Sequence, residues 1–470
     1  MNPVHSAMPR IRIAFALFLV HAIVTIPWAV ANWGISAAGI FILAAWLSLA
    51  ALAVPLARGE YAGRPYWFLL VGSLICSRLT AFLMVDGATL VGDPEIYESL
   101  AHSLLSGHGL IFHDALTDVD FRALYPPVYP LFLAGLGSIF GLGPCTYWVS
   151  NVVIDLASAL ILIRLGARFG SLAVGRAAAW LFAIWPAFVF AAPFAQKEGL
   201  VALEVLTITL VLLRAGQDRP PGWRDGTLLG LASGGLMLTQ PGLALLPAIL
   251  GLVLLPAVGW RSLRALLLKA LPFALLLLAP WWIRNFFLFG SFVPLTTTGG
   301  LGLWVGNNPN ATGNWMPVPD AYRRMPEIMM SARAAQDALT WIWDYPLDFV
   351  KLTFFKLFHA FGIEQFTLGR FGLMTPKPSS ATLAGLFPLL QGSLIALFAG
   401  VALLGGRLSL IDRENRLILI LCGCAAQILL FSLPFEFGER HRWFLMPFLF
   451  LVVAAGFIRP PGAIRSTTPA

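Results

Sequence analysis

Apolar runs long enough to cross a membrane recur along almost the whole chain, and they limit its possible folds more than any other feature. Clear examples are residues 12–31, 66–85, 265–283 and 443–458. A helix of about 20 apolar residues crosses a hydrocarbon core of about 30 Å. Of the 470 residues, 58% are hydrophobic and 11% are charged, whereas soluble domains carry roughly 25% charged residues. The sequence therefore predicts an all-α polytopic membrane protein.

Basic residues at the ends of these runs predict the orientation of the helices. Arg10 and Arg12 precede the first run, which lacks a small-residue cleavage site and is interpreted as a retained transmembrane helix. Residues 125–143 are rich in proline and glycine. If they lie along the interface or re-enter the membrane, the later basic clusters all face the cytoplasm. This alternation predicts about twelve transmembrane helices and cytoplasmic termini. The predicted spans are approximately 12–33, 35–57, 66–86, 145–164, 176–192, 198–214, 226–239, 241–257, 265–283, 384–405, 416–434 and 443–458.

The same alternation divides the chain into four parts. Residues 1–65 form an N-terminal extension of two spans, and residues 66–283 form a membrane core whose first outer loop, 87–125, is acidic. Residues 284–382 form a long outer loop with one or two interfacial helices, and residues 383–470 hold the last spans. The net charge of +8 does not indicate nucleic-acid binding, because orientation alone explains basic residues at the ends of spans.

Few charges lie within the predicted spans. Asp155 and Glu204 are the acidic residues that fall in the middle third of a span. A lipid-linked oligosaccharide transporter or flippase would place a set of ionisable groups near the midplane, often in inverted repeats. An O-antigen ligase or polymerase, a further alternative, would rely on arginines and a histidine in its large outer loop. The distribution favours a site at the outer face that is supplied from the lipid.

The stretch GDPEIYESLAHSLLSGHG, residues 92–109, follows the third predicted span. Its apolar residues recur at three- and four-residue spacing, with polar residues on the opposite face, which predicts a short amphipathic helix at the interface. Asp93 stands where an N-cap residue belongs, and Gly107 where a C′ glycine belongs. Capping alone is one explanation of Asp93. The other is that its carboxylate is a general base for an acceptor hydroxyl, with Glu95 as the second candidate.

These residues also carry a resemblance to a known class of enzymes. The pattern G-D-x-x-x-Y-x-x-x-A-x-x-L-x-x-G-x-G from Gly92, followed by YPPVYPLFLA from Tyr125, resembles the membrane-embedded glycosyltransferases of the GT-C class. The similarity is to the branch of protein O-mannosyltransferases and lipid A aminoarabinose transferases, especially bacterial relatives that act on lipopolysaccharide cores. Weaker matches lie at 281–300, 303–315 and 438–456. The acidic loop follows the third predicted span, whereas in the class it usually follows the first, so the first two spans are extra. Asp93-Pro94-Glu95 replaces the common paired acidic form.

The resemblance implies an activity and a location. Such enzymes transfer a sugar from a polyprenyl-phosphate carrier to an acceptor at the outer face of the bacterial inner membrane, with inversion at the anomeric carbon. The acceptor is a glycan, a glycolipid or a protein. An aspartate in the first outer loop is the base in this class, and the role maps to Asp93.

A departing phosphate requires cations nearby. Lys197, Arg440 and Arg442 are the outward-facing candidates, although Lys197 also fits a surface ion pair with Glu198. Arg440 and Arg442 equally fit ion pairs with Glu436 or Glu439. Candidates for substrate binding are Tyr97, His108, Glu198, Trp304 and Asn307. No spacing of His, Asp and Glu indicates a closed metal site, so no cofactor is expected. A divalent ion shared with Asp93 or Asp114 is the alternative that the sequence leaves open without indicating it.

Overall fold

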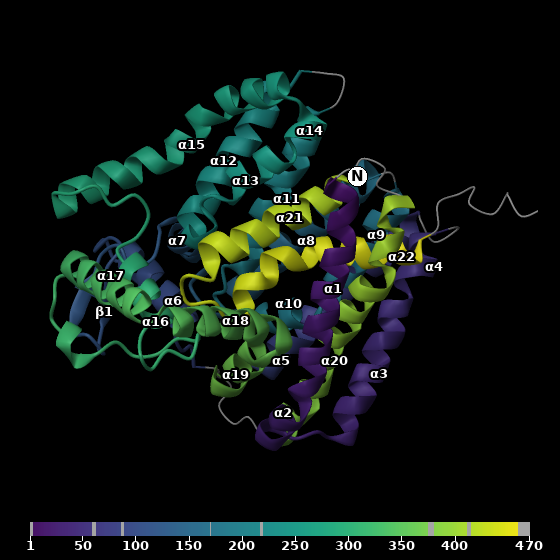
Figure 1. Ribbon diagram of the computed structural model, residues 1–470, viewed down its shortest axis with the longest axis horizontal. Helices are drawn as coiled ribbons and strands as arrows, with labels where there is room; N and C mark the ends of the chain where they lie inside the picture. The colour runs from purple at the N-terminus through teal and green to yellow at the C-terminus, as the bar shows by residue number, and fades with distance from the viewer. Residues whose placement is uncertain are drawn as a thin grey trace, which may run out of the picture.

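The computed structural model describes nearly all of the chain. The described residues are 3–58, 63–85, 89–169, 171–216, 220–374, 380–410 and 415–458. They are almost entirely helical (Figure 1), and their regular strands form one hairpin, β1 (Phe112–Asp114) and β2 (Val119–Phe121). The prediction of an all-α polytopic membrane protein is confirmed.

The helices follow one another in this order. The N-terminal half contains α1 (Pro3–Val24), α2 (Ile26–Trp33), α3 (Ala37–Ala51), α4 (Ala53–Ala57), α5 (Arg64–Met84), α6 (Asp93–Leu105), α7 (Val128–Phe140), α8 (Pro144–Arg168), α9 (Leu172–Ala183), α10 (Pro186–Ala191) and α11 (Glu198–Ala215). Next come α12 (Trp223–Thr239), η2 (Pro241–Leu243), α13 (Leu246–Val253), α14 (Leu255–Val258) and α15 (Trp260–Phe289). The outer segment contains α16 (Gly299–Gly306), η3 (Asp320–Tyr322), α17 (Glu327–Asp344), α18 (Pro346–Gly362) and α19 (Gln365–Met374). The last elements are α20 (Ser380–Leu404), η4 (Gly405–Leu410), α21 (Arg416–Gln427), the π-helix η5 (Ile428–Ser432), η6 (Glu439–Leu445) and α22 (Met446–Phe457).

Not every predicted span is a single straight helix. Within the described ranges, six helices are long and apolar enough to cross a membrane. The predicted span 176–192 is divided into α9 and α10 at Pro186, and the span 241–257 into η2, α13 and α14. A proline ring cannot continue a helix without losing a backbone hydrogen bond. The segment 125–143 contains α7, whose 13 residues reach only about 20 Å, too short to cross.

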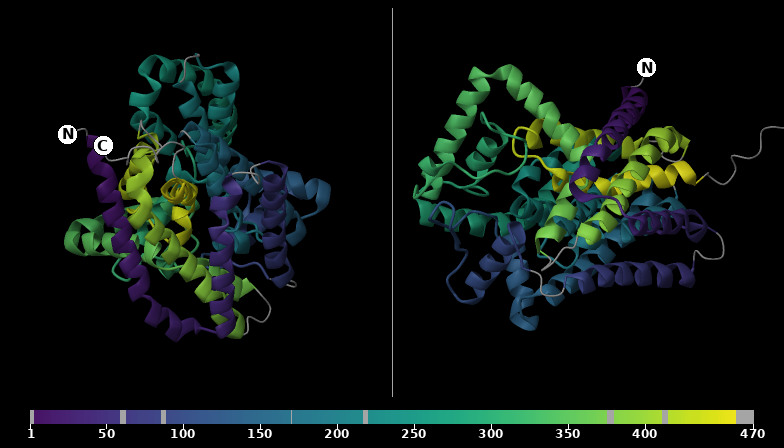
Figure 2. Two further views of the ribbon diagram at one scale, coloured as in Figure 1. Left: turned by 90° about the vertical axis from the view of Figure 1, so that its right-hand side faces the viewer. Right: turned by 90° about the horizontal axis from the view of Figure 1, so that it is seen from below.

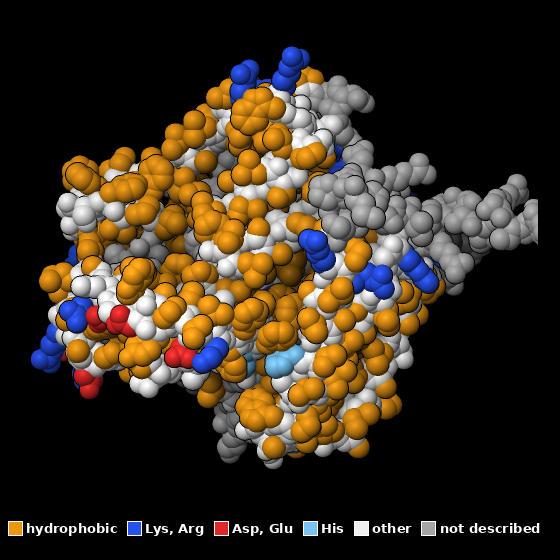
Figure 3. Space-filling model, viewed as in Figure 1, with side chains coloured by type: hydrophobic (Ala, Val, Ile, Leu, Met, Phe, Trp, Pro, Cys, Tyr) orange, Lys and Arg blue, Asp and Glu red, His pale blue; other side chains and the backbone are white. Residues whose placement is uncertain are grey.

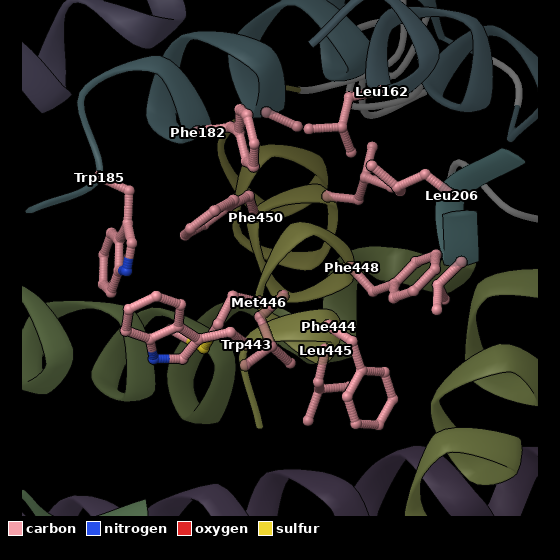
Figure 4. Packing of buried hydrophobic residues seen from close by; sticks show 14 of the residues in the cluster. Leu162, Phe182, Trp185, Leu206, Trp443, Phe444, Leu445, Met446, Phe448 and Phe450 are labelled. Atoms are coloured by element: carbon pink, nitrogen blue, oxygen red, sulfur yellow. The ribbon is translucent and has the colours of Figure 1, made fainter. Parts of the chain in front are cut away.

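The helix α22 lies at the centre of the bundle. It is apolar on every side, and a helix of that kind is stable only when it is surrounded by other helices. Phe448 and Phe450 are fully buried, and Figure 4 shows them among side chains of neighbouring helices, including Phe182 of α9 and Leu206 of α11. Trp185 packs against Phe450 with the ring centroids 5.0 Å apart. The core therefore fixes the position of the residues that immediately precede α22.

The helices α12 and α15 pack closely and form an arm beside this core (Figures 1 and 2). Gly226, Gly230 and Gly234 face α15, and a Cβ atom at any of them would press on α15 between Lys269 and Ala274. Small residues at such spacing let membrane helices approach closely. The arm thereby holds the end of α12, and η2 after it, against the bundle.

The two acidic residues in the middle of predicted spans make local contacts, and Arg78, a third charge in the middle of the predicted span 66–86, is the partner of one of them. Arg78 is fully buried on α5, and its Nε donates to Asp155 Oδ2 of α8 at 2.7 Å. Glu204 Oε1 on α11 accepts from the Thr239 hydroxyl of α12 at 3.1 Å. Each carboxylate therefore joins two neighbouring helices, as buried polar groups in membranes usually do.

The two ends of the bundle differ in charge. At one end, Arg12, Arg58 and Arg407 donate hydrogen bonds to backbone carbonyls at the C-terminal ends of α20 and α22. At the other end lie α17 and α18, where acidic and basic side chains alternate, and the surface between is mostly hydrophobic (Figure 3). In the outer segment 284–382, where the sequence predicts one or two interfacial helices, α17 and α18 follow one another. Trp343 of α17 is 86% exposed, which suits an aromatic anchor at a membrane surface.

Candidate active site

A cavity of about 500 Å³ lies where α11, η2, the π-helix η5 and η6 meet. One part of its wall is polar and the larger part is apolar. The charged and polar lining residues are Tyr125, Lys197, Glu198, Gln240, Thr296, Thr298, Gln427, Ser432, Glu436, Arg440 and His441. The apolar wall includes Val201, Leu243, Leu245, Leu295, Phe431, Phe435, Trp443 and Phe444. The cavity therefore offers polar groups for a head group and apolar groups for a chain.

Asp93 lies directly behind this cavity, held by two of its lining residues. The Tyr125 hydroxyl donates to Asp93 Oδ1 at 2.6 Å, and the Arg440 guanidinium forms an ion pair with Oδ2. The Asp93 side chain is 12% exposed. Both carboxylate oxygens thus have charge-stabilising partners, which favour the ionised form.

The capping explanation of Asp93 is wrong. The structure makes Gly92 the N-cap of α6 and Asp93 its first residue, and no side chain caps the helix. Gly92 has φ +67°, and a Cβ atom there would collide with the guanidinium of Arg370. Arg370 of α19 in turn donates to the Val91 carbonyl. A glycine is required because only glycine permits both this backbone conformation and this approach. Gly107 does follow α6 with φ +79°, as a C′ glycine does.

Lys197 is a partly buried cation without a hydrogen-bonding partner among the described residues. It precedes α11, and its Nζ lies 5.6 Å from the ring centroid of Tyr97 and 5.5 Å from that of Tyr125. Within the part of the chain that the structure describes, it makes neither a hydrogen bond nor an ion pair. Burial lowers the pKa of Lys197. Glu198 attracts Lys197 electrostatically, but Glu198 is buried, so the two residues do not form the surface ion pair that was the alternative.

Two carboxylates share the cavity with Lys197. Glu198 is 7% exposed, and its buried Oε2 lacks a hydrogen-bond partner among the described residues. Glu436 Oε1 lies 4.0 Å from Arg440 Nη2. Burial raises the pKa of Glu436 to about 7, against the opposing effect of Lys197 and other cations. Glu436 is thus close to half protonated at neutral pH.

The structure separates the two arginines before α22. Arg440 lines the cavity, and burial lowers its pKa to about 10, so it remains charged at neutral pH. Arg442 does not line the cavity. It is fully buried, forms an ion pair with Glu364 and donates to the Ala360 carbonyl. The structure therefore does not bring Arg442 to the candidate phosphate position and gives it a structural partner instead.

Trp304 and Asn307 also lie away from the cavity. Trp304 of α16 is buried against Tyr322, with the ring centroids 5.8 Å apart. Asn307 is fully buried, and its side chain donates to the Leu303 carbonyl at 2.8 Å. Its Oδ1 accepts from Lys356 Nζ at 3.2 Å. Neither side chain is placed to contact a ligand in the cavity.

The remaining predicted residues all belong to α6 or follow it. Tyr97 is 1% exposed and packs against Tyr125 at 4.9 Å between centroids, so it supports the cavity wall without lining it. Glu95 and His108 are exposed and lie outside the cavity lining. Within the described residues, no three His, Cys, Asp or Glu side chains are grouped so as to hold a metal ion.

Three residues in or beside the candidate site are not singled out by the sequence. The sequence predicts no role for Tyr125, which begins the YPP motif. It indicates Glu436 only as an ion-pair partner of an arginine. Arg370 belongs to an outer segment whose path the sequence does not indicate. The YPP motif was a usable signal for Tyr125, whereas nothing in the sequence pointed to Arg370.

Comparisons with known proteins show the fold. No family model matches the chain, and no curated protein matches it. Among solved structures, the apo oligosaccharyltransferase of Archaeoglobus fulgidus matches with 13% identity and a TM-score of 0.50, over 85% of this chain and 51% of that chain. The same enzyme complexed with Zn and sulfate matches with 15% identity and a TM-score of 0.48, over 82% and 48%. ArnT from Cupriavidus metallidurans bound to undecaprenyl phosphate matches with 14% identity and a TM-score of 0.36, over 84% and 78%.

The architecture is thus that of a GT-C membrane glycosyltransferase, the class that the sequence resembles. The chain spans about half the length of the oligosaccharyltransferase that it matches. At 13% identity the similarity shows the fold alone.

Proposed function

We propose that this protein is a membrane glycosyltransferase that moves a sugar from a polyprenyl-phosphate donor to an acceptor hydroxyl, with inversion and with Asp93 as the general base. One observation carries the proposal. A single cavity combines a long apolar wall with the cations Lys197 and Arg440, and Arg440 is paired with the carboxylate of Asp93.

The donor fits the two parts of the cavity wall. An isoprenoid chain suits the apolar part, formed by residues such as Leu243, Leu245 and Phe431. Its phosphate suits Lys197 and Arg440, because cations in a site of low dielectric stabilise the charge that develops on a leaving phosphate. Lys197 is attracted by Glu198 and Glu436 but makes no direct hydrogen bond among the described residues, so its ammonium group can donate to an anion without breaking one.

The proposed reaction is a single displacement. The acceptor oxygen forms a bond to the anomeric carbon, and the bond from that carbon to the phosphate oxygen breaks. The phosphate leaves with the electron pair, and the acceptor proton passes to Asp93. Attack from the side opposite the leaving group inverts the anomeric carbon. Tyr125 and Arg440 keep Asp93 ionised and fixed before the reaction, which is what a pre-positioned base requires.

The proposal includes a location. The basic groups at the opposite end of the bundle support a cytoplasmic assignment of that end. The cavity then opens at the outer face of a bacterial inner membrane. The acceptor there is a glycan, a glycolipid or a protein hydroxyl.

The test is the variant Asp93→Asn in membranes supplied with labelled polyprenyl-phosphate sugars. Loss of a general base typically slows a reaction by about 10²- to 10⁴-fold, so transfer falls by at least that lower factor. Asp348→Asn, which removes an exposed carboxylate on α18, is the matched control and transfers at the wild-type rate. Undiminished transfer by a folded Asp93→Asn protein would remove Asp93 as the base. Movement of the labelled lipid across the membrane without sugar transfer would favour a transporter.

A further inference from the structure

Glu436 lines the cavity together with two cations, a second carboxylate and a histidine. Oppositely charged and like-charged groups reach it from several elements. They are Lys197 and Glu198 at the start of α11, Arg370 on α19, Lys356 on α18, Arg440 and His441 on η6, and Asp93 behind Arg440, with the Tyr125 hydroxyl nearby. Burial lowers the pKa of His441 well below its usual value, so this ring is neutral at neutral pH.

The charges that line the cavity balance one another before a donor enters. Lys197 and Arg440 are positive, and Glu198 and Glu436 are negative when ionised. A phosphate placed against the two cations also approaches these carboxylates. An ionised carboxylate only accepts hydrogen bonds and repels the phosphate, whereas a protonated one donates. One proton on a lining carboxylate would therefore remove a repulsion and add a hydrogen bond.

We propose that the donor phosphate binds together with one proton, which Glu436 carries, so that the Glu436 carboxyl donates a hydrogen bond to a phosphate oxygen between Lys197 and Arg440. The inference rests on the proposed function, since it assumes a phosphate in this cavity. It assigns to Glu436 a binding role that is distinct from the role of Asp93 as base.

The geometry selects Glu436 over Glu198 as the group that carries the proton. Glu436 lies 4.0 Å from Arg440, beside the cation that also holds Asp93. The pKa of Glu436, about 7, means that little free energy is needed to protonate it near neutral pH. An arriving phosphate raises this pKa further, because like charges disfavour ionisation. The protonated form predominates below about pH 7 and is lost as the pH rises through that value, so donor affinity falls as the pH rises.

The experiment measures the Kd of methyl undecaprenyl phosphate for the purified full-length protein as a function of pH. This probe is a phosphodiester, so its own charge stays constant over the range. If only the protonated form of Glu436 binds, a pKa of about 7 makes the Kd rise about thirtyfold between about pH 6 and about pH 8.5. Glu436→Gln carries a permanent donor and binds at about pH 8.5 as tightly as the wild type does at about pH 6.

Three further variants make the result specific. Glu436→Asp keeps a titrating carboxyl and retains a pH-dependent Kd, which guards against a folding defect in Glu436→Gln. Glu198→Gln retains the wild-type pH dependence, and so does Asp348→Asn on the exposed face of α18. A flat profile in Glu198→Gln would place the proton on Glu198 and overturn the proposal.

The remaining outcomes separate this inference from the proposed function. An unchanged pH dependence in Glu436→Gln would assign the effect to loss of charge on Lys197 and would also overturn the inference. Binding by the wild type that does not vary with pH would overturn it while leaving a phosphate-binding cavity intact. Absence of binding at every pH would instead contradict the proposed polyprenyl-phosphate donor.

Discussion

Tyr125→Phe is the most informative single change at the candidate base. The substitution removes one hydroxyl, which donates to Asp93 Oδ1 at 2.6 Å, and keeps the ring that packs against Tyr97 and Lys197. A hydrogen bond to a charged group contributes about 1.5–3 kcal/mol. The Asp93 side chain is only 12% exposed, so water replaces little of this loss.

The loss should appear as a shift in the pH dependence of the reaction. The hydroxyl stabilises the ionised carboxylate, so without it the carboxylate takes up a proton at higher pH. At about 1.36 kcal/mol per pH unit, the acid limb of the kcat profile moves up by about one to two pH units. At saturating donor the kcat profile reports the bound complex, so donor binding by Glu436 does not enter.

Tyr129→Phe is the matched control for this measurement. Tyr129 is fully buried, and its hydroxyl has no hydrogen-bond partner among the described residues. Its ring packs on Tyr97 at 4.8 Å between centroids, outside the cavity lining. We expect its acid limb to coincide with that of the wild type. An unshifted acid limb in Tyr125→Phe, with the fold intact, would refute the assignment of Asp93 as the titrating base.

Three other variants test the surroundings of the cavity. Lys197→Met removes the cation that lies over Tyr125 and should weaken binding of a polyprenyl phosphate at least tenfold, as measured by lipid titration, with the melting temperature unchanged or raised. Arg442→Met leaves Glu364 as an unpaired buried charge and should cost about 3–5 kcal/mol of stability in denaturant unfolding, whereas Arg442→Met combined with Glu364→Gln recovers most of it. Gly92→Ala forces a strained backbone against Arg370 and should cost about 1–3 kcal/mol by the same method, with lower kcat because the start of α6 moves.

Much of the fold follows from the spacing of apolar residues. Apolar length predicts where helices lie, and the predicted runs are helical in the structure. Their breaks were not predicted, because a proline such as Pro186 ends one helix or begins another depending on tertiary contacts. Likewise, the amphipathic pattern predicted α6 but misplaced its cap by one residue. The backbone of Gly92, with φ +67°, is set by the approach of Arg370 from a distant segment.

The contrast between Arg440 and Arg442 shows why part of the site could not be foreseen. Both arginines precede the last predicted span, and the sequence predicts the same phosphate-binding role for both. The structure forms a 3-10 helix there, η6, with three residues per turn. Side chains two positions apart then point in widely different directions. Arg440 consequently faces Asp93 and the cavity, and Arg442 faces Glu364 in the interior.

The charge distribution explains why so many ionised groups persist in a membrane protein. A buried charge is costly unless it is paired, and Arg440 meets this requirement by contacting both Asp93 and Glu436. Lys197 is the exception within the described part of the cavity wall, since it lies over the rings of Tyr97 and Tyr125 and is attracted by Glu198 and Glu436 without a direct ion pair. Cation–π contacts compensate only part of the lost hydration. A cation without a direct ion pair contributes more to the binding of an anion than to the stability of the fold. Lys197→Met should therefore reduce lipid binding without reducing the melting temperature.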